Sequence, residues 1–218
     1  MFKFLSAAIL YIFIITGGLA STRDTIYGVG DVENDLFIWL KSEGFDLEIY
    51  SDLGKAVNEI PASAVLLIVA DQYPGKRVPV EKGLVEMMEE KDIRYYLEYP
   101  SIFPGRDLSQ EAIRTRLERG VVVSEAFGST LSPMSILGIN DCLIIPVTHD
   151  QPMVVLAKVA GLDQAAYGLT DVPVYPLLVK EGEGFLSLTK LSDFAKGRYG
   201  PEDHWQTFWG FIGSAILF

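Results

Sequence analysis

Hydrophobic residues run without a polar break over residues 64–70, and the run ends at Asp71 and a Tyr-Pro-Gly turn at residues 73–75. A continuous apolar run of this length, rich in β-branched residues and closed by turn residues, is typical of a strand covered on both faces in a parallel sheet. Ligands of open α/β sheets bind beyond the carboxyl ends of such strands. We therefore expect any site to lie near residues 71–73.

The first half of the chain alternates short apolar segments with stretches of helical periodicity. Strands are predicted at residues 25–29, 45–50, 93–97 and 120–123, and helices around residues 36–40 and at 51–60, 80–91 and 108–117. Asp31 or Asn34 is expected to cap the first of these helices, whose apolar residues share one face. Repeated strand–helix units predict an α/β protein with a mainly parallel sheet and right-handed crossovers.

After residue 140 the pattern changes to strands with short links, predicted at residues 142–147, 153–160, 174–180 and 184–191. The Glu-Gly-Glu-Gly sequence at residues 181–184 is turn chemistry, so the last two strands are expected to form an antiparallel hairpin. Residues 201–218 carry large apolar side chains at helical spacing after Pro201. Their apolar stretch is too short to span a bilayer, so this segment is predicted to be a core helix.

The amino-terminal segment, residues 1–20, has the pattern of a secretory signal peptide: Lys3, then an apolar run over residues 4–15, then small residues before Ser21. An uncleaved membrane anchor is the alternative, but the apolar run is shorter than the roughly 20 residues that a spanning helix needs. The expected organisation is a leader over residues 1–20 and one domain over residues 21–218. A secreted or periplasmic location follows, with no stable membrane insertion after cleavage.

Charge and composition exclude several functions. The net charge is −11, and removal of the leader would make it −12 because only Lys3 is lost. An acidic chain without a basic run is a poor partner for nucleic acid. With one cysteine, Cys142, and two histidines, neither an internal disulfide nor an ordinary zinc site is expected. The Gly-Val-Gly at residues 28–30 lacks the third glycine of a dinucleotide fingerprint, since Glu33 takes that place. No cofactor or metal is predicted.

The carboxyl-terminal third carries a recognisable pattern: Val-Val-Leu-Ala-Lys-Val-Ala-Gly at 154–161, Ala-Tyr-Gly-Leu at 166–169, Leu-Thr-Lys-Leu-Ser at 188–192, and Gly-Arg-Tyr-Gly-Pro at 197–201 with Trp205. With the element order of the whole mature chain, it resembles a class I glutamine amidotransferase-like domain of the kind attached to secreted bacterial polysaccharide-degrading enzymes, near trehalose-utilisation-type proteins. The resemblance implies a flavodoxin-like three-layer sandwich with a mainly parallel sheet and a C-terminal antiparallel hairpin. Such domains often lack the parent activity.

The catalytic signature of that family is missing. A true amidotransferase has a cysteine in a Gly-x-Cys-x-Gly elbow after a strand, but the strand that should feed the elbow ends in Glu98-Tyr99-Pro100. Cys142 enters an apolar strand, where a neutral buried thiol is expected rather than a nucleophile. Neither His149 nor His204 stands at the family's spacing, and His204 is expected to be structural.

Other side chains remain candidates. Asp71, Glu98 and Glu125 each follow a predicted strand, and such acids either act as general acid and base and hold sugar hydroxyls, or cap helices and satisfy loop amides. His149 follows the strand at residues 142–147 and joins them as a catalytic candidate. Tyr73 and Tyr99 are candidates for binding a sugar ring.

Two main hypotheses follow. The first is a non-catalytic exported accessory domain of a carbohydrate-degrading system, for assembly or glycan presentation, with a carbohydrate ligand or a downstream glycoside hydrolase domain or subunit as partner. The second is a hydrolase that acts on a glycan or small amide through Asp71, Glu98, Glu125 or His149. A third hypothesis makes Cys142 a true nucleophile.

Overall fold

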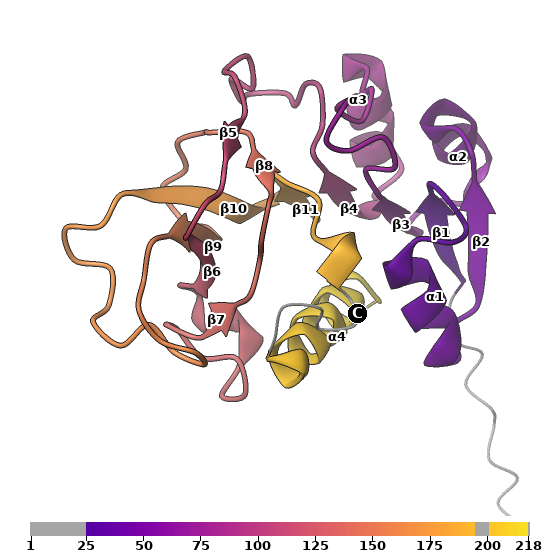
Figure 1. Ribbon diagram of the computed structural model, residues 1–218. Coiled ribbons are helices and arrows are strands. Elements are labelled where there is room, and N and C mark those ends of the chain that lie inside the picture. Colours follow the sequence, from indigo (N-terminus) through magenta and orange to yellow (C-terminus); the bar gives the residue numbers. More distant parts are fainter. Residues whose placement is uncertain (1–24, 195–200, 218) are drawn as a thin grey trace, which may run out of the picture.

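The computed structural model describes residues 25–194 and 201–217, and it contains a large mixed sheet with helices around it (Figure 1). The strand order is β2-β1-β3-β4-β11-β10-β9-β6-β7. The strands are β1 (Ile26–Val29), β2 (Leu47–Tyr50), β3 (Val65–Ile68), β4 (Arg94–Glu98), β6 (Arg119–Val122), β7 (Ile136–Leu137), β9 (Pro152–Ala157), β10 (Val174–Glu181) and β11 (Gly184–Ser187). A small second sheet pairs β5 (Ile113–Arg114) with β8 (Leu143–Ile144). The predicted leader lies outside the described residues, as do residues 197–200 of the recognisable pattern.

The amino-terminal half is parallel, as predicted. Neighbouring strands from β2 through β1, β3 and β4 to β11 all pair in parallel. The helices α1 (Asp35–Ser42), α2 (Leu53–Glu59) and α3 (Lys82–Glu90) connect the first four strands. Asn34 caps α1 by accepting the N–H of Leu36 at 3.0 Å, and Asp52 caps α2 by accepting the N–H of Lys55 at 2.7 Å.

The sheet becomes antiparallel from β11 onward. The β10–β11 hairpin closes at Glu181 and Gly184, as predicted from the turn residues. The strands β9, β6 and β7 then add with antiparallel pairing. Pro176 lies inside β10, and the register with β9 shifts between Pro176 and Leu178, because proline has no N–H for the ladder. The mainly parallel prediction therefore holds for one half of the sheet only.

The helix predicted at residues 108–117 is wrong. This segment is extended, and its residues 113–114 form β5, which pairs with β8. Thr115 donates its N–H to the carbonyl of Cys142 at 2.9 Å, and the Arg77 guanidinium binds the carbonyls of Leu108 and Gln110. These tertiary hydrogen bonds hold the backbone extended, so they override its helical charge pattern.

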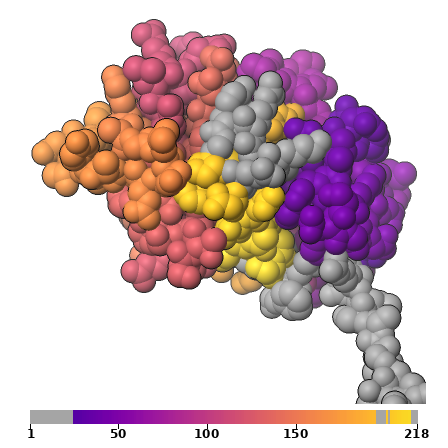
Figure 2. Space-filling model, turned by 60° about the horizontal axis from the view of Figure 1, so that its bottom comes forward, coloured from indigo at the N-terminus to yellow at the C-terminus, as the bar shows by residue number. Residues whose placement is uncertain are grey.

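The helices lie in two groups. Figure 1 shows α2 and α3 together above the parallel strands, and α1 and α4 (Glu202–Leu217) below them. The predicted carboxyl-terminal helix is confirmed, and its Trp205, Phe208 and Trp209 are buried. Trp209 packs edge-on against Tyr96 of β4 with ring centroids 5.4 Å apart. In the view of Figure 2, α4 lies between the indigo amino-terminal part and the orange β9–β10 connection, so it joins the two halves of the sheet.

Two further observations concern the described residues as a whole. No helix within the described residues is long and apolar enough to cross a membrane. Over the same residues, no group of three or more His, Cys, Asp or Glu side chains is arranged to hold a metal ion.

Candidate functional site

Glu98 ends β4 and is completely buried. Its Oε1 accepts the Tyr96 hydroxyl at 2.8 Å and the N–H groups of Leu191 and Ser192 at 2.9 and 2.7 Å. Its Oε2 accepts the N–H of Ala70 at 3.1 Å and the Ser192 hydroxyl at 2.9 Å. Both carboxylate oxygens are therefore occupied by protein donors.

The hydrogen-bond network around Glu98 joins four segments of the chain. Ala70 follows β3, and Ser192 begins the 3-10 helix η2 (Ser192–Phe194). Asn34 donates its side-chain N–H to the Ser192 hydroxyl at 3.1 Å, which adds the start of α1 to the network. Burial raises the pKa of the Glu98 carboxyl above its usual value, while hydrogen bonds from Ala70, Tyr96 and Ser192 oppose that rise. This environment is that of a structural carboxylate, because no solvent or substrate reaches it.

Asp71 lies in the loop after β3 and is exposed. It lines two hollows: a cavity of about 660 Å³ at the carboxyl ends of β1, β2 and β3, and a smaller depression of about 250 Å³ beside the start of α1. The depression is also lined by Asp31, Asp193 and Lys190, and Lys190 is paired with Asp193 at 3.0 Å. Of the four acid and histidine candidates, only Asp71 faces either hollow.

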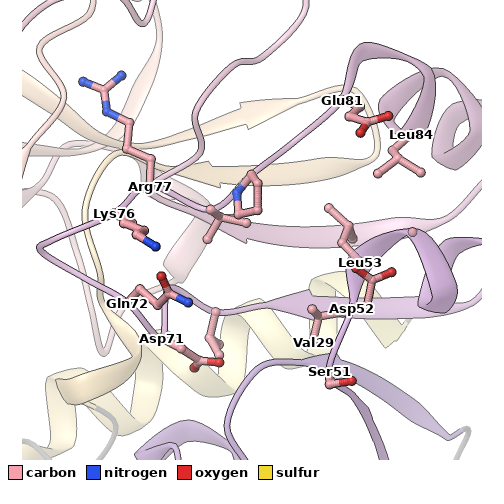
Figure 3. A pocket seen from close by; sticks show the side chains of 14 residues that line it. Val29, Ser51, Asp52, Leu53, Asp71, Gln72, Lys76, Arg77, Glu81 and Leu84 are labelled. Atoms are coloured by element: carbon pink, nitrogen blue, oxygen red, sulfur yellow. The ribbon is translucent and has the colours of Figure 1, made fainter.

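The larger cavity also contains residues that sequence reasoning did not propose as ligands. Ser51, Gln72, Lys76 and Glu81 line it together with Asp71 (Figure 3). Ser51 directly follows β2 and Gln72 directly follows Asp71, so both lie beyond the carboxyl ends of parallel strands, where ligands of open α/β sheets bind. Their position after a predicted strand could therefore have identified both from the sequence. Lys76 and Glu81 lie further along the β3–α3 loop, where the sequence gives no such signal.

Tyr73 and Tyr99 do not offer an open ring surface. Tyr99 is buried, with its ring 5.0 Å from that of Tyr73 in an edge-on contact and 5.8 Å from the Arg77 guanidinium. Tyr73 is half-buried, and its hydroxyl lies 3.3 Å from that of Thr189 and 3.2 Å from the carbonyl of Leu143. Burial raises the pKa of Tyr73. Both tyrosines therefore pack within the fold.

Tyr99 also adopts an unusual backbone conformation. Its φ is +43°, in the left-handed region that a bulky residue rarely adopts. β4 is the strand that was expected to feed an amidotransferase elbow. The residue after it carries a buried aromatic ring in place of a nucleophile.

Cys142 is buried beside the same cluster. Its thiol donates to the carbonyl of Asn140 at 3.4 Å, and burial raises its pKa to about 11. A neutral thiol is a poor nucleophile near neutral pH.

Glu125 is exposed in the 3-10 helix η1 (Glu125–Phe127) that follows β6. Three strands separate β6 from β4, which places them about 19 Å apart at the usual strand spacing. In addition, β6 runs antiparallel to β4. The chain therefore leaves β6 at the end of the sheet where β4 begins. The structure does not bring Glu125 together with Asp71 or Glu98.

His149 belongs to a separate charged group. Its Nε2 lies 3.6 Å from Oε1 of Glu181, which also accepts the Arg106 Nε–H at 2.5 Å. Its Nδ1 accepts the N–H of Gln151 at 3.1 Å. Glu181 ends β10, and its carbonyl accepts the hydroxyl of Tyr95 near the start of β4. His149 therefore lies near the amino end of β4, whereas Asp71 lies at the carboxyl end of the neighbouring strand β3. His204 is buried, with Nδ1 2.8 Å from the carbonyl of Ile136.

No protein-family model matches the chain, and no curated protein matches it. The resemblance to glutamine amidotransferase-like domains therefore rests on the residue pattern alone. Chemically, the described site offers the exposed carboxylates of Asp52, Asp71 and Glu81 beside a cavity, and no described base or nucleophile is in hydrogen-bond contact with Asp71. Binding of a polar molecule is the chemistry that this arrangement supports best.

Proposed function

We propose that this protein is a non-catalytic, glutamine amidotransferase-like accessory domain of an exported carbohydrate-degrading system, which serves assembly or the presentation of a glycan. One observation carries the proposal: Glu98, the candidate at the end of the strand expected to feed the elbow, is fully buried and uses both oxygens to accept protein hydrogen bonds. A catalytic acid or base must reach the proton that it transfers. Glu98 has no such access.

The remaining candidates add support. Cys142 is buried with a raised pKa, and Glu125 and His149 lie away from Asp71. A hydrolase needs at least two groups on one substrate, and paired carboxylates of glycosidases are about 5–10 Å apart. Asp71 has no such partner among the acids and histidine proposed from the sequence.

The finer fold class is part of the same proposal. Parallel strands in the order β2-β1-β3-β4, with α2 and α3 on one side and α1 and α4 on the other, support a flavodoxin-like three-layer sandwich (Figure 1). The antiparallel strands β10, β9, β6 and β7 would then be an extension of its edge. The leader pattern at residues 1–20 supports a secreted or periplasmic location, and a glycoside hydrolase domain or subunit is the proposed partner.

The alternative is a hydrolase that acts on a glycan or small amide. The exposed carboxylate of Asp71 beside a cavity is the observation that favours it. In that case Asp71 would act as the general base that takes a proton from the attacking water molecule.

Turnover measurements separate these functions. The purified protein is incubated with aryl glycosides, oligosaccharides and small amides, and products are followed by chromatography. The accessory-domain proposal predicts no product above the blank, with or without iodoacetamide. Product formation that is lost in Asp71→Asn would establish the hydrolase, and product formation lost in Cys142→Ser would establish a thiol enzyme. Glu90→Gln, an exposed acid at the end of α3, is the matched control.

A further inference from the structure

The cavity of about 660 Å³ lies at a change of direction in the chain order. From β1 the chain passes through α1 to β2 on one side, and from β2 it passes through α2 to β3 on the other side of β1. Loops that leave β1 and β3 in opposite directions open a crevice at the carboxyl ends of the strands, which is where open α/β sheets bind ligands. The volume is in the range of small-molecule sites.

Several polar side chains in the lining have no partner among the described residues. The side chains of Asp71, Glu81 and Lys76 form no hydrogen bond or ion pair there, and Glu81 does not cap α3 although it stands at the cap position. Ser51 and Gln72 likewise have uncommitted side chains. These groups provide both acceptors and donors to a bound molecule.

The other polar residues of the lining are already used by the fold. Asp52 caps α2, and Arg77 binds the carbonyls of Leu108 and Gln110. Figure 3 shows Asp71, Gln72 and Lys76 near one another, with Arg77 extended away from them and Asp52 and Glu81 on the far side of the cavity. The free polar groups therefore face the cavity from two sides.

The rest of the lining is apolar and comprises Val29, Leu53, Gly54, Val69, Val78, Pro79 and Leu84. None of the lining residues is aromatic, so a flat base or ring has no stacking surface. Among the described lining residues, the carboxylates of Asp52, Asp71 and Glu81 outnumber the cations of Lys76 and Arg77, which disfavours phosphorylated ligands. An uncharged molecule with an aliphatic frame and many hydroxyl groups matches both the apolar and the polar parts of the lining.

We propose that this cavity binds a single neutral sugar or cyclitol unit, with Asp71 and Glu81 accepting from its hydroxyl groups and Lys76, Gln72 and Ser51 completing the hydrogen bonds. The inference rests on the proposed function, and it names the ligand class and the site. The C–H groups of the ring lie against Val29 and Val69. This site differs from the one expected at Tyr73 and Tyr99, whose rings are not available.

The backbone next to Asp71 is held in place before a ligand arrives. Its neighbour Ala70 donates to Glu98, and Gly30 packs against Asp71 from the bend after β1. A Cβ built on Gly30 would lie 2.3 Å from Cγ2 of Val69 and 3.0 Å from Oδ1 of Asp71, and Gly30 has a φ of +147°. A side chain there would displace Val69 and Asp71. A carboxylate on a backbone segment that is already held in place loses less conformational freedom when a ligand binds.

Isothermal titration tests the proposal with glucose, galactose, mannose and myo-inositol as neutral probes, and with glucosamine, glucose 6-phosphate and glutamine as charged ones. At least one neutral probe is expected to bind with a Kd on the order of 1 mM or tighter, as expected for a ligand of this size. Asp71→Asn and Lys76→Ala should each weaken binding about tenfold. Glu90→Gln, which lies outside the cavity, should leave the Kd unchanged, and circular dichroism checks that every variant is folded.

Three results would overturn the assignment: no neutral probe binds, only a charged probe binds, or binding is equal in wild type and in Asp71→Asn. Failure here is distinguishable from failure of the proposed function. Cleavage of an aryl glycoside that is lost in Asp71→Asn would contradict the non-catalytic role while supporting the site. Absence of both binding and turnover would contradict the site while leaving the non-catalytic role in place.

Discussion

The carboxylate of Glu98 accepts a hydrogen bond from the backbone N–H of Ala70 at 3.1 Å and thereby joins the carboxyl ends of β4 and β3 inside the protein. The residue after Ala70 is Asp71, the exposed acid that lines the main cavity. One buried acid therefore supports the segment that presents one exposed acid. Their roles differ because their burial differs, although both lie at the carboxyl ends of parallel strands.

Asn34→Ala should lower the free energy of unfolding by about 1–2 kcal/mol, because it removes both the cap of α1 and the hydrogen bond to Ser192. Urea unfolding measures the change. Asp52→Ala is the matched control, since it removes only the cap of α2. An equal loss in the two variants would show that the link from Asn34 to the Glu98 network adds nothing.

Cys142 should resist alkylation in the folded protein. Its pKa is about 11 when folded, above the usual 9.0, so the protonated thiol is favoured by the fold. This contribution to stability is complete below pH 9.0 and is lost as pH rises through about 11.

Unfolding experiments at about pH 8 and about pH 10.5 should therefore show a larger loss for wild type than for Cys142→Ala. Rapid reaction of the native thiol with iodoacetamide at about pH 8 would contradict the buried, neutral state.

Gly184→Ala should be destabilising by about 1–3 kcal/mol, through overpacking at the start of β11. A Cβ at this position would lie 2.4 Å from the ring of Tyr95, which is itself buried. Gly83→Ala is the control in α3, where a Cβ meets no atom within 4 Å and helix propensity favours alanine. Thermal unfolding should therefore shift downward for the first variant and slightly upward for the second.

The sequence predicted the parallel half of the fold well because its apolar runs and helix caps are local signals. Asn34 and Asp52 cap their helices, and residues 64–70 form the buried strand β3 with its flanking residues. It failed at residues 108–117, where pairing with β8 and contacts from Arg77 decide the conformation. The two-residue strand β7 was missed because it is too short to show alternation.

The candidate site was predicted in part. The carboxyl end of β3 does border a cavity, and Asp71 lines it. The sequence did not reveal that Glu98 is enclosed by residues 191–192, which are distant along the chain. Nor did it reveal that β9, β6 and β7 add to the predicted hairpin with antiparallel pairing, which separates Glu125 and His149 from Asp71.

Their different burial assigns a structural role to Glu98 and a binding role to Asp71. The free energies of unfolding of Glu98→Gln and Asp71→Asn test this assignment. In Glu98→Gln, an amide NH₂ would face backbone and hydroxyl donors, so a loss of about 1–3 kcal/mol is expected. Because Asp71 is exposed, Asp71→Asn should change the free energy of unfolding by less than about 0.5 kcal/mol. Unchanged stability in Glu98→Gln, or a loss in Asp71→Asn as large as that expected for Glu98→Gln, would contradict the account.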